Sequence, residues 1–246
     1  MTDALLIENL AHAYGDQPVL RGVDLRLARG DFMALIGPNG SGKTTLLRSL
    51  TGILAPQTGR ILIDGVDLRA DPVGAKARLG LAIDPELLPG ALTGRQCLKL
   101  FASVRGIDGV PADSLELAKA LNFAPWLDRL VEEYSLGTRQ KLGILLGLIG
   151  NPPLIVLDEP MNGLDPVSAW AIKQHLVTLT RERGCAVLLA THALEVAERF
   201  ITRAQLLLEG RCARTWDEPQ LVAIRHDPTR SLEQAMVETL RELAAA

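Results

Sequence analysis

Cysteine is scarce in this 246-residue chain, which contains three of them: Cys97, Cys185 and Cys212. They are far apart, odd in number and form no Cys-x-x-Cys pair, so neither a disulfide framework nor a zinc site is indicated. The pattern favours a reducing compartment, in which we expect the three side chains to serve as small apolar residues.

The chain also lacks runs of like charge and long apolar stretches. Its 26 basic and 29 acidic residues give a formal net charge of −3, so no nucleic-acid partner is expected. No apolar stretch approaches the roughly 20 residues of a membrane-spanning helix, and the N-terminus lacks the basic region of a secretory signal. We therefore expect a cytoplasmic chain, which another protein would have to recruit for any work at a membrane.

What is present is enough apolar sequence, 48% of the residues, for one large domain or a domain with an inserted subdomain. Residues 4–36 alternate apolar and polar positions and then become wholly apolar in FMALI, which predicts peripheral antiparallel strands leading to a buried strand. Further strand-like runs are RILIDGVDL, RLGLAID, PLIVLD and CAVLLAT. Since helical patterns separate them, we predict an α/β fold with a mostly parallel sheet covered on both faces.

A helical insert of about 60 residues interrupts the strands. From residue 93 to 151, apolar residues recur at three- and four-residue intervals, as in Leu98, Phe101, Val104 and Ile107. The predicted division is therefore a core of residues 1–84 and 152–215, a helical subdomain of residues 85–151, and a short helical tail of residues 216–246.

Three helix boundaries have local signals. The apolar helix containing ILLGLIG is predicted to end at Asn151, because the following proline disfavours the α conformation there. A later helix is expected to be capped by Asp165 and closed by Gly184. The tail from Asp217 is predicted to be a polar connection followed by one amphipathic helix, SLEQAMVETLREL.

The stretch GPNGSGKTT follows the apolar strand FMALI and opens a helix expected to start at Gly42 or Lys43. In that context a glycine-rich P-loop binds phosphate, because its backbone N–H groups face inward and the helix N-terminus adds its dipole. Lys43 would reach the β- and γ-phosphates, and Thr44 would offer its hydroxyl to Mg²⁺. The predicted nucleotide-binding residues here are Gly37, Pro38, Asn39, Gly40, Ser41, Gly42, Lys43, Thr44 and Thr45, with Lys43 also counted as catalytic.

The motif LIVLDEP places Asp158 and Glu159 at the C-terminal end of a buried strand, where open α/β sheets bind ligands. Asp158 is predicted to hold magnesium, directly or through water, and Glu159 to polarise a water for attack on the γ-phosphate. His192 follows the apolar run CAVLLAT and is expected to reach the same edge of the sheet, as a third candidate catalytic residue.

The stretch YSLGTRQKLG begins at residue 134, with Ser135 at the N-terminus of an apolar helix. Taken alone, Ser135 is explained as an ordinary N-cap. Taken together in their order along the chain, however, the motifs resemble those of the nucleotide-binding subunit of ATP-binding cassette (ABC) transporters. The resemblance covers nearly the whole chain, from ENLAHAYG to the tail helix. YSLGTRQKLG stands where that family carries its signature, between the P-loop and DEP.

The resemblance implies several residue roles, with ATP and Mg²⁺ as cofactors. Ser135 and Gly137 would bind, in trans, the γ-phosphate of ATP held by the P-loop of a second subunit. Tyr14 matches the aromatic residue that stacks on adenine, and Asp165 in NGLD matches the loop residue that touches the partner subunit. His192 matches the histidine that senses the γ-phosphate.

The chain also departs from the family pattern. The signature reads SLGTR where many members have SGGQ, and Asp84 stands where the family usually has glutamine. An aspartate brings negative charge beside a phosphate, which is unfavourable unless a metal ion compensates it. Our hypothesis is that Asp84 binds Mg²⁺ through a water. These departures, with the short helical insert and short tail, resemble the exporter branch that handles antibiotics and peptides.

The leading interpretation is an ATPase in which two subunits, expected to be identical, close on ATP and open after hydrolysis. They would drive a separate membrane permease docked near residues 84–105. Docking to this permease would hold the chain at the cytoplasmic face of the membrane. Leu87, Leu88 and Leu92 fit either that docking surface or the core. Two alternatives are a soluble ABC ATPase that remodels a protein assembly, and a module that binds ATP but hardly hydrolyses it.

Overall fold

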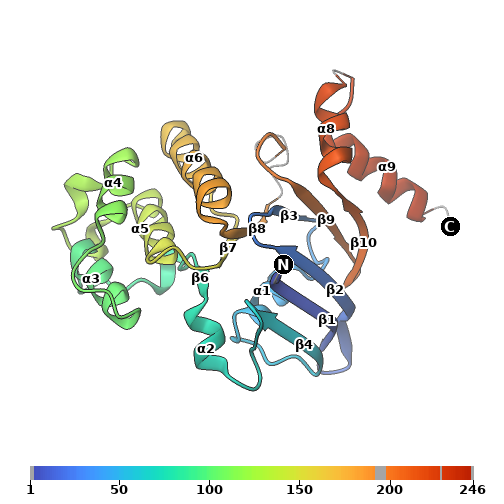
Figure 1. Cartoon of the computed structure of the whole chain (residues 1–246), viewed down its shortest axis with the longest axis horizontal. Coiled ribbons are helices and arrows are strands. Elements are labelled where there is room, and N and C mark those ends of the chain that lie inside the picture. The colour runs from blue at the N-terminus through green and yellow to red at the C-terminus, as the bar shows by residue number, and fades with distance from the viewer. Residues whose placement is uncertain (1–2, 192–197, 228, 245–246) are drawn as a thin grey trace.

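Two β-sheets and the helices around them make up the computed structural model, which describes residues 3–191, 198–227 and 229–244 (Figure 1). The strands are β1 (Asp3–Tyr14), β2 (Gln17–Ala28), β3 (Phe32–Ile36), β4 (Thr58–Ile63), β5 (Val66–Asp67), β6 (Leu79–Leu81), β7 (Leu154–Asp158), β8 (Ala186–Ala190), β9 (Arg203–Leu208) and β10 (Arg211–Trp216). The α-helices are α1 (Lys43–Leu50), α2 (Pro72–Ala77), α3 (Gly94–Val104), α4 (Ala112–Ala120), α5 (Leu136–Leu148), α6 (Pro166–Arg183), α8 (Glu218–His226) and α9 (Leu232–Ala244). The 3₁₀ helices are η1 (Pro85–Leu87), η2 (Ala124–Trp126) and η3 (Val131–Glu133).

The central sheet has the strand order β10-β9-β3-β8-β7-β6. The strands from β9 to β6 pair in parallel, whereas edge strand β10 pairs antiparallel with β9. All of β3 is buried: Phe32, Ala34 and Ile36 join one apolar cluster, and Met33 and Leu35 join another on the opposite face. The predicted mostly parallel sheet, covered on both faces, is therefore confirmed.

The second sheet is antiparallel throughout, in the order β2-β1-β4-β5. Its apolar residues share a cluster with Leu46, Leu47 and Leu50 of α1 and with Leu35 of β3. The P-loop helix is thus packed among residues of both sheets, and the predicted N-terminal antiparallel portion is confirmed. The predicted start of this helix at Gly42 or Lys43 is also correct, because α1 begins at Lys43.

The helical segment between β6 and β7 lies at one end of the molecule (Figure 1). Its helix α5 approaches the core closely through two glycines on one face. A Cβ on Gly143 would collide with the Ile83 carbonyl oxygen, and one on Gly147 would lie 2.6 Å from the Leu81 carbonyl oxygen. The Ile83 amide donates to the Gly143 carbonyl at 3.1 Å. Backbone therefore packs directly on backbone here.

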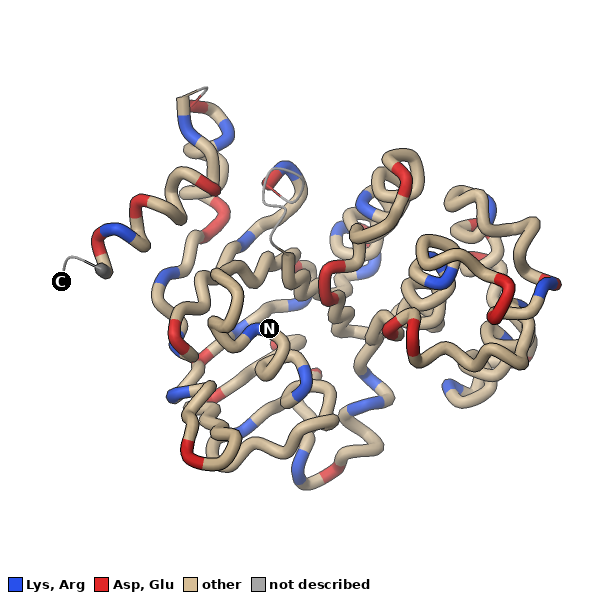
Figure 2. The backbone as a smooth tube through the Cα atoms, turned by 180° about the vertical axis from the view of Figure 1, so that it is seen from behind, with Lys and Arg blue, Asp and Glu red and all other residues tan. Residues whose placement is uncertain are grey.

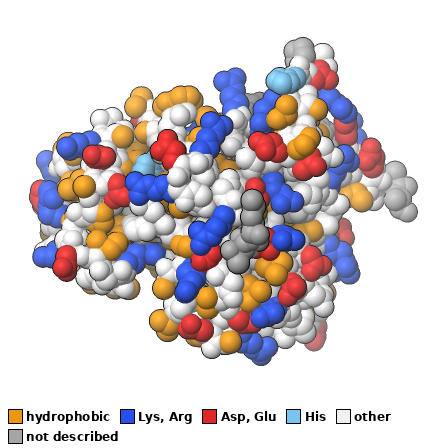
Figure 3. All heavy atoms as spheres, viewed as in Figure 1, with side chains coloured by type: hydrophobic (Ala, Val, Ile, Leu, Met, Phe, Trp, Pro, Cys, Tyr) orange, Lys and Arg blue, Asp and Glu red, His pale blue; other side chains and the backbone are white. Residues whose placement is uncertain are grey.

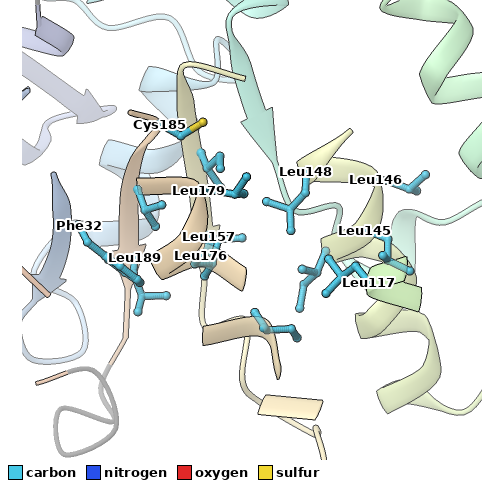
Figure 4. Close-up of a cluster of buried hydrophobic side chains, with 14 of the residues drawn as sticks. Phe32, Leu117, Leu145, Leu146, Leu148, Leu157, Leu176, Leu179, Cys185 and Leu189 are labelled. Atoms are coloured by element: carbon cyan, nitrogen blue, oxygen red, sulfur yellow. The ribbon is translucent and has the colours of Figure 1, made fainter. Parts of the chain in front are cut away.

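A single apolar cluster connects the central sheet to this helical segment. Figure 4 shows its side chains running from Phe32, Leu189 and Leu157 of the sheet, past α6, to Leu145 of α5 and Leu117 of α4. Because the cluster is continuous, the helices do not have a core that is separate from that of the sheet.

The three thiols are unpaired. Cys97 and Cys185 are buried in the cluster of Figure 4, as expected of small apolar residues. Cys212 is half-buried, and its Sγ donates to the Asp24 carbonyl oxygen at 3.1 Å. Burial raises the pKa of the Cys212 thiol to about 11, so this side chain is neutral at physiological pH.

The predicted end of α5 and part of the predicted buried face of α3 are wrong. Helix α5 ends at Leu148, before the predicted Asn151, because Gly150 and Asn151 take positive φ values of 77° and 49°. In α3 the buried face contains Leu98, whereas Val104, assigned to that face from its spacing, is 81% exposed. Ile107, used to define the spacing, lies beyond the end of the helix.

The C-terminal part contains more regular structure than predicted. Strands β9 and β10 were not assigned from sequence, and residue 216, the predicted first residue of the tail, is the buried last residue of β10. The expected polar connection after Asp217 is instead helix α8, which begins with a capping box between Asp217 and Gln220. The amphipathic helix predicted after it is present as α9.

Residues with charges of both signs are interspersed along the described part of the chain (Figure 2) and among the hydrophobic side chains on the face seen in Figure 3. This agrees with the near-neutral composition. None of the helices within the described ranges is long and apolar enough to cross a bilayer.

The glycine face of α5 can be tested with Gly147→Ala. Alanine favours a helix by about 1 kcal/mol over glycine, yet its Cβ would meet the backbone of Leu81 and Ala82. We expect the free energy of unfolding to fall by about 1–3 kcal/mol in urea titrations, as overpacking does. Leu136→Ala, at a 64% exposed position of the same helix, should change it by less than about 0.5 kcal/mol. Equal stability of Gly147→Ala and the wild type would contradict the close packing.

Candidate active site

The P-loop between β3 and α1 is held in shape by its own lysine. The Lys43 ammonium donates to the carbonyl oxygens of Gly37 (2.7 Å) and Pro38 (3.1 Å). Gly42 precedes the helix with φ 106°, in the left-handed region that glycine adopts without strain. The lysine therefore spans the loop and lies where a phosphate bound by the loop would also contact it.

Two further features of the loop fit a phosphate. A Cβ on Gly37 would collide with the Leu207 carbonyl oxygen, so only glycine suits this position. The Ser41 hydroxyl is buried and has no hydrogen-bond partner among the described residues, as expected of a group that bonds to a ligand. Thr44 is exposed at the first turn of α1, whereas Thr45 is buried.

The carboxylate pair lies where β7 ends. Asp158 pairs with Ala190 of β8, and the Glu159 amide donates to the Ala190 carbonyl oxygen at 2.9 Å. Glu159 has φ 45°, a left-handed conformation that is strained for a residue with a side chain. Its carboxylate accepts from the Thr191 hydroxyl at 3.3 Å. His192 lies outside the described residues.

The electrostatics of Asp158 suit a cation. Loss of hydration and the neighbouring charge of Glu159 raise the pKa of Asp158, and Asp84 adds to this, while Lys43 and Arg48 lower it. Asp158 is nonetheless the one exposed residue of β7, so a cation could approach it from solvent. A divalent cation would relieve the repulsion among these carboxylates.

Asp84 caps the short helix η1, where its carboxylate accepts from the Glu86 amide at 2.9 Å. It is exposed and follows β6, which pairs in parallel with β7, so it lies towards the edge of the sheet where Asp158 ends β7. Its charge also contributes to raising the pKa of Asp158. The described residues contain no group of three or more His, Cys, Asp or Glu that would hold a metal without other ligands. A magnesium site here would therefore need hydroxyl, water or phosphate oxygens as well, as Mg²⁺ sites commonly do.

Ser135 is the N-cap of α5, as its position in the sequence suggests. Its Oγ accepts from the Thr138 amide at 3.3 Å and lies 2.9 Å from the Thr138 hydroxyl. The serine is exposed and Thr138 is buried. Capping and phosphate binding are compatible roles, because a helix N-terminus with an accessible hydroxyl is itself suited to an anion.

The signature segment touches the loop after β7. A Cβ on Gly137 would lie 2.6 Å from the Gly163 carbonyl oxygen, and the Gln140 side chain donates to the Pro160 carbonyl oxygen at 3.3 Å. Lys141 forms an ion pair with Asp165 at 2.9 Å and also donates to the Leu121 carbonyl oxygen. The N-terminal half of α5 is thus fixed to the segment that carries Glu159.

Asp165 begins α6, and Gly184 ends it in the left-handed conformation, both as predicted. The Asp165 carboxylate accepts from the Ser168 amide (2.9 Å) and hydroxyl (2.6 Å). These bonds and the Lys141 ammonium hold the pKa of Asp165 well below its usual range. Sequence reasoning missed Lys141, since its partner is 24 residues away and no local signal marks the pair.

Tyr14 ends β1 and is 48% exposed, so part of its ring is accessible. The hairpin that carries it is fixed to the P-loop: a Cβ on Gly42 would lie 3.1 Å from the Leu20 side chain of β2. The turn after β9 connects both, because the Gly210 amide donates to the Ser41 carbonyl and the Arg21 amide donates to the Gly210 carbonyl.

Comparison with known proteins agrees with this arrangement. A family profile described as ABC transporter matches residues 20–162. The chain belongs to the ABC transporter family. The resemblance of its sequence motifs to that family is therefore confirmed.

Individual members of the family support the same placement. The chain is 36% identical, over 213 residues, to a daunorubicin resistance ATP-binding protein, DrrA3, of Streptomyces coeruleorubidus. The match covers 85% of this chain and 66% of that relative, slightly under two thirds of its length.

Solved structures also resemble the fold. One, described as an ATP-binding subunit of an ABC transporter, superposes with a TM-score of 0.86 at 28% identity, covering 96% of this chain and 99% of the other. A dimeric structure of MJ0796, a bacterial ABC transporter cassette, has a TM-score of 0.78 at 25% identity, covering 87% and 98%.

The charge of Asp165 can be tested through the pH dependence of stability. Because the folded pKa is lowered, the stabilisation is present above the unfolded value of about 3.9 and is lost as pH falls below it. Asp165→Asn keeps a good N-cap, so we expect it to lower the unfolding free energy by less than about 1 kcal/mol at pH 7, since the pair is partly exposed. This loss should begin to shrink as the pH falls below about 4 and should disappear only when the pH passes below the lowered pKa of folded Asp165.

The ion pair between Lys141 and Asp165 leads to a second prediction for the free energy of unfolding as a function of pH. In a Lys141→Met background, Asp165→Asn should destabilise the chain less at pH 7 than it does in the wild type. A difference that stays constant from pH 7 down to the lowest pH at which the chain remains folded would contradict a charge effect.

Proposed function

We propose that this chain is an ATP-binding and ATP-hydrolysing subunit of an ABC transporter, energising a separate membrane permease in an exporter. The observation that carries the proposal is the meeting of three features at one edge of the sheet. These are a P-loop with an unsatisfied buried hydroxyl at Ser41, a carboxylate pair at the end of β7, and a loop tied directly to the signature helix.

In this proposal the P-loop exchanges internal contacts for contacts to ATP. Lys43 transfers its hydrogen bonds from the Gly37 and Pro38 carbonyls to phosphate oxygens, and Ser41 gains the partner that it lacks. Thr44 and Asp158 hold Mg²⁺, with Asp84 contributing through a water. When bound, Mg²⁺ neutralises phosphate charge during hydrolysis.

Glu159 is proposed to orient and polarise the attacking water. Its backbone leaves the strand conformation in a strained, left-handed form that the hydrogen bond to Ala190 helps to hold. The Thr191 hydroxyl further restricts the carboxylate. His192 is proposed to sense the γ-phosphate from the end of the neighbouring strand.

Two copies would complete two sites. Helix α5 lies apart from the P-loop helix α1 in Figure 1. Ser135 is the exposed N-cap of α5 and Gly137, in its first turn, is partly exposed, so we propose that they bind ATP held by another subunit. Asp165 and the loop before it are proposed to touch the partner. The P-loop and signature are both present in this chain, which favours a homodimer with two working sites.

The direction of transport is inferred from a relative. The daunorubicin resistance protein named above matches 85% of this chain, and resistance to an antibiotic is a role of exporters. Asp84 at the usual glutamine position and the SLGTR signature also agree with the exporter branch. The cargo would be bound by the permease.

The permease is proposed to dock near residues 84–105, at the cytoplasmic face of the membrane. Leu87 is 75% exposed there, whereas Leu88 is buried and Leu92 is partly buried against the core. Exposed apolar side chains also occur at Leu100 and Val104 of α3. Docking surface and core, the two roles considered for these leucines, therefore apply to different residues. Leu87 is available for docking, and Leu88 belongs to the core.

Glu159→Gln tests hydrolysis. The amide cannot accept a proton, so we expect phosphate release to fall by at least about 100-fold, the usual contribution of a general base. ATP should then hold a dimer, detectable by size-exclusion chromatography. The control Glu116→Gln, on the exposed surface of α4, should leave both readouts unchanged. A slow rate that is the same in wild type and Glu159→Gln would favour the ATP-binding module without turnover.

Leu87→Glu tests docking in the same background. Tagged Glu159→Gln protein, extracted gently from its native cells with ATP, should copurify a polytopic membrane protein in stoichiometric amount. Adding Leu87→Glu should remove that partner and leave ATP binding intact, whereas Val222→Glu on α8 should change neither. Reproducible recovery of soluble proteins alone would favour the assembly-remodelling alternative.

A further inference from the structure

A buried histidine lies beside the proposed adenine site. His12 is on β1, two residues before Tyr14, and is 8% exposed. Both of its ring nitrogens are buried, and neither forms a hydrogen bond with the part of the chain that the structure describes. A neutral imidazole has one donor and one acceptor, and burying them without partners is unfavourable. A leucine or phenylalanine would fill this space without that loss of free energy.

The His12 ring forms an aromatic contact with Tyr14. The two ring centroids are 4.9 Å apart and the ring planes meet at 80°, an edge-to-face arrangement. Such pairs are favourable because the positive edge of one ring meets the negative face of the other. The contact restricts the orientation of a tyrosine ring that is otherwise half exposed at the end of a strand.

The position of His12 in the hairpin connects this contact to the P-loop. His12 lies opposite Leu20 in the β1–β2 ladder, and Leu20 is the side chain that a Cβ on Gly42 would touch. The residue that holds Tyr14 is thus next to the residue that packs on the start of α1. This fixes the tyrosine ring relative to the phosphate-binding loop.

We propose that His12 is a positioning residue for the nucleotide base: its imidazole ring holds Tyr14 in the orientation on which adenine stacks. The effect comes from the ring and not from its nitrogens, because these are buried out of reach of a ligand. The proposal rests on the adenine-stacking role proposed for Tyr14. It predicts that His12 affects the binding of a base but not of a triphosphate.

The test compares the dissociation constants of Mg-ATP and Mg-tripolyphosphate, measured by calorimetry. His12→Leu fills the space without an aromatic edge and should weaken ATP binding about two- to tenfold, with tripolyphosphate binding unchanged. His12→Phe restores a ring and should bind ATP within about twofold of wild type. His175→Leu, a histidine on α6 outside the hairpin, should bind both ligands normally.

Kinetics give an independent readout. For His12→Leu the KM for ATP should rise by the same factor, while kcat at saturating ATP is unchanged, because the variant loses only ground-state binding. Unchanged tripolyphosphate affinity also shows that the variant is folded at its P-loop.

Tyr14→Ala separates this inference from the role proposed for Tyr14. If Tyr14→Ala weakens ATP binding and His12→Leu does not, the positioning role is wrong and the base site stands. If His12→Phe is as weak as His12→Leu, the ring contact is not the cause and the proposal fails. If Tyr14→Ala binds ATP normally, adenine does not stack on Tyr14, and both proposals fall together.

Discussion

The burial of β3 on both faces is the constraint on which the rest of the structure depends. Its five residues divide between the two apolar clusters, so the strand cannot shift without disturbing the antiparallel sheet on one side and the helices on the other. The P-loop begins directly after this strand, at Gly37. A loop of mostly glycine and exposed residues thereby acquires a fixed origin. Its other end is fixed by α1, which is packed in the cluster of the antiparallel sheet.

The helical segment is joined to that core by two kinds of contact. Glycine faces bring the backbone of α5 against the residues that follow β6, and polar groups at the N-terminal end of α5 bind the loop between Glu159 and Asp165. Both are short-range and specific in geometry, so a displacement of α5 would be transmitted to both segments. Under the proposed function this matters, since one segment carries Asp84 near the permease and the other carries Glu159. ATP contacts at Ser135 in one subunit would then be linked to the hydrolytic residue of the same chain.

Sequence identified the parts whose signals are local. An apolar strand followed by GPNGSGKTT predicts a P-loop before α1, and Asp165 with Gly184 marks both ends of α6. One local signal lies in the segment expected to be a polar connection: Asp217 and Gln220 form a capping box at the start of α8. Other features have no local signal at all. The pairing of Lys141 with Asp165 and the approach of Gly137 to Gly163 join segments separated by more than 20 residues. They follow from the fold and could not be deduced before it.

The charge of the site determines the form in which ATP can bind under the proposed function. Loss of hydration and the negative charges of Glu159 and Asp84 raise the pKa of Asp158, and the positive charges of Lys43 and Arg48 do not cancel this rise. A free triphosphate would add several negative charges to a region that already disfavours them. A magnesium complex brings its own compensating charge, so under the proposed function the site would favour the magnesium complex of the nucleotide over the free triphosphate. An aspartate at position 84, where a neutral amide would add no charge, would strengthen that preference.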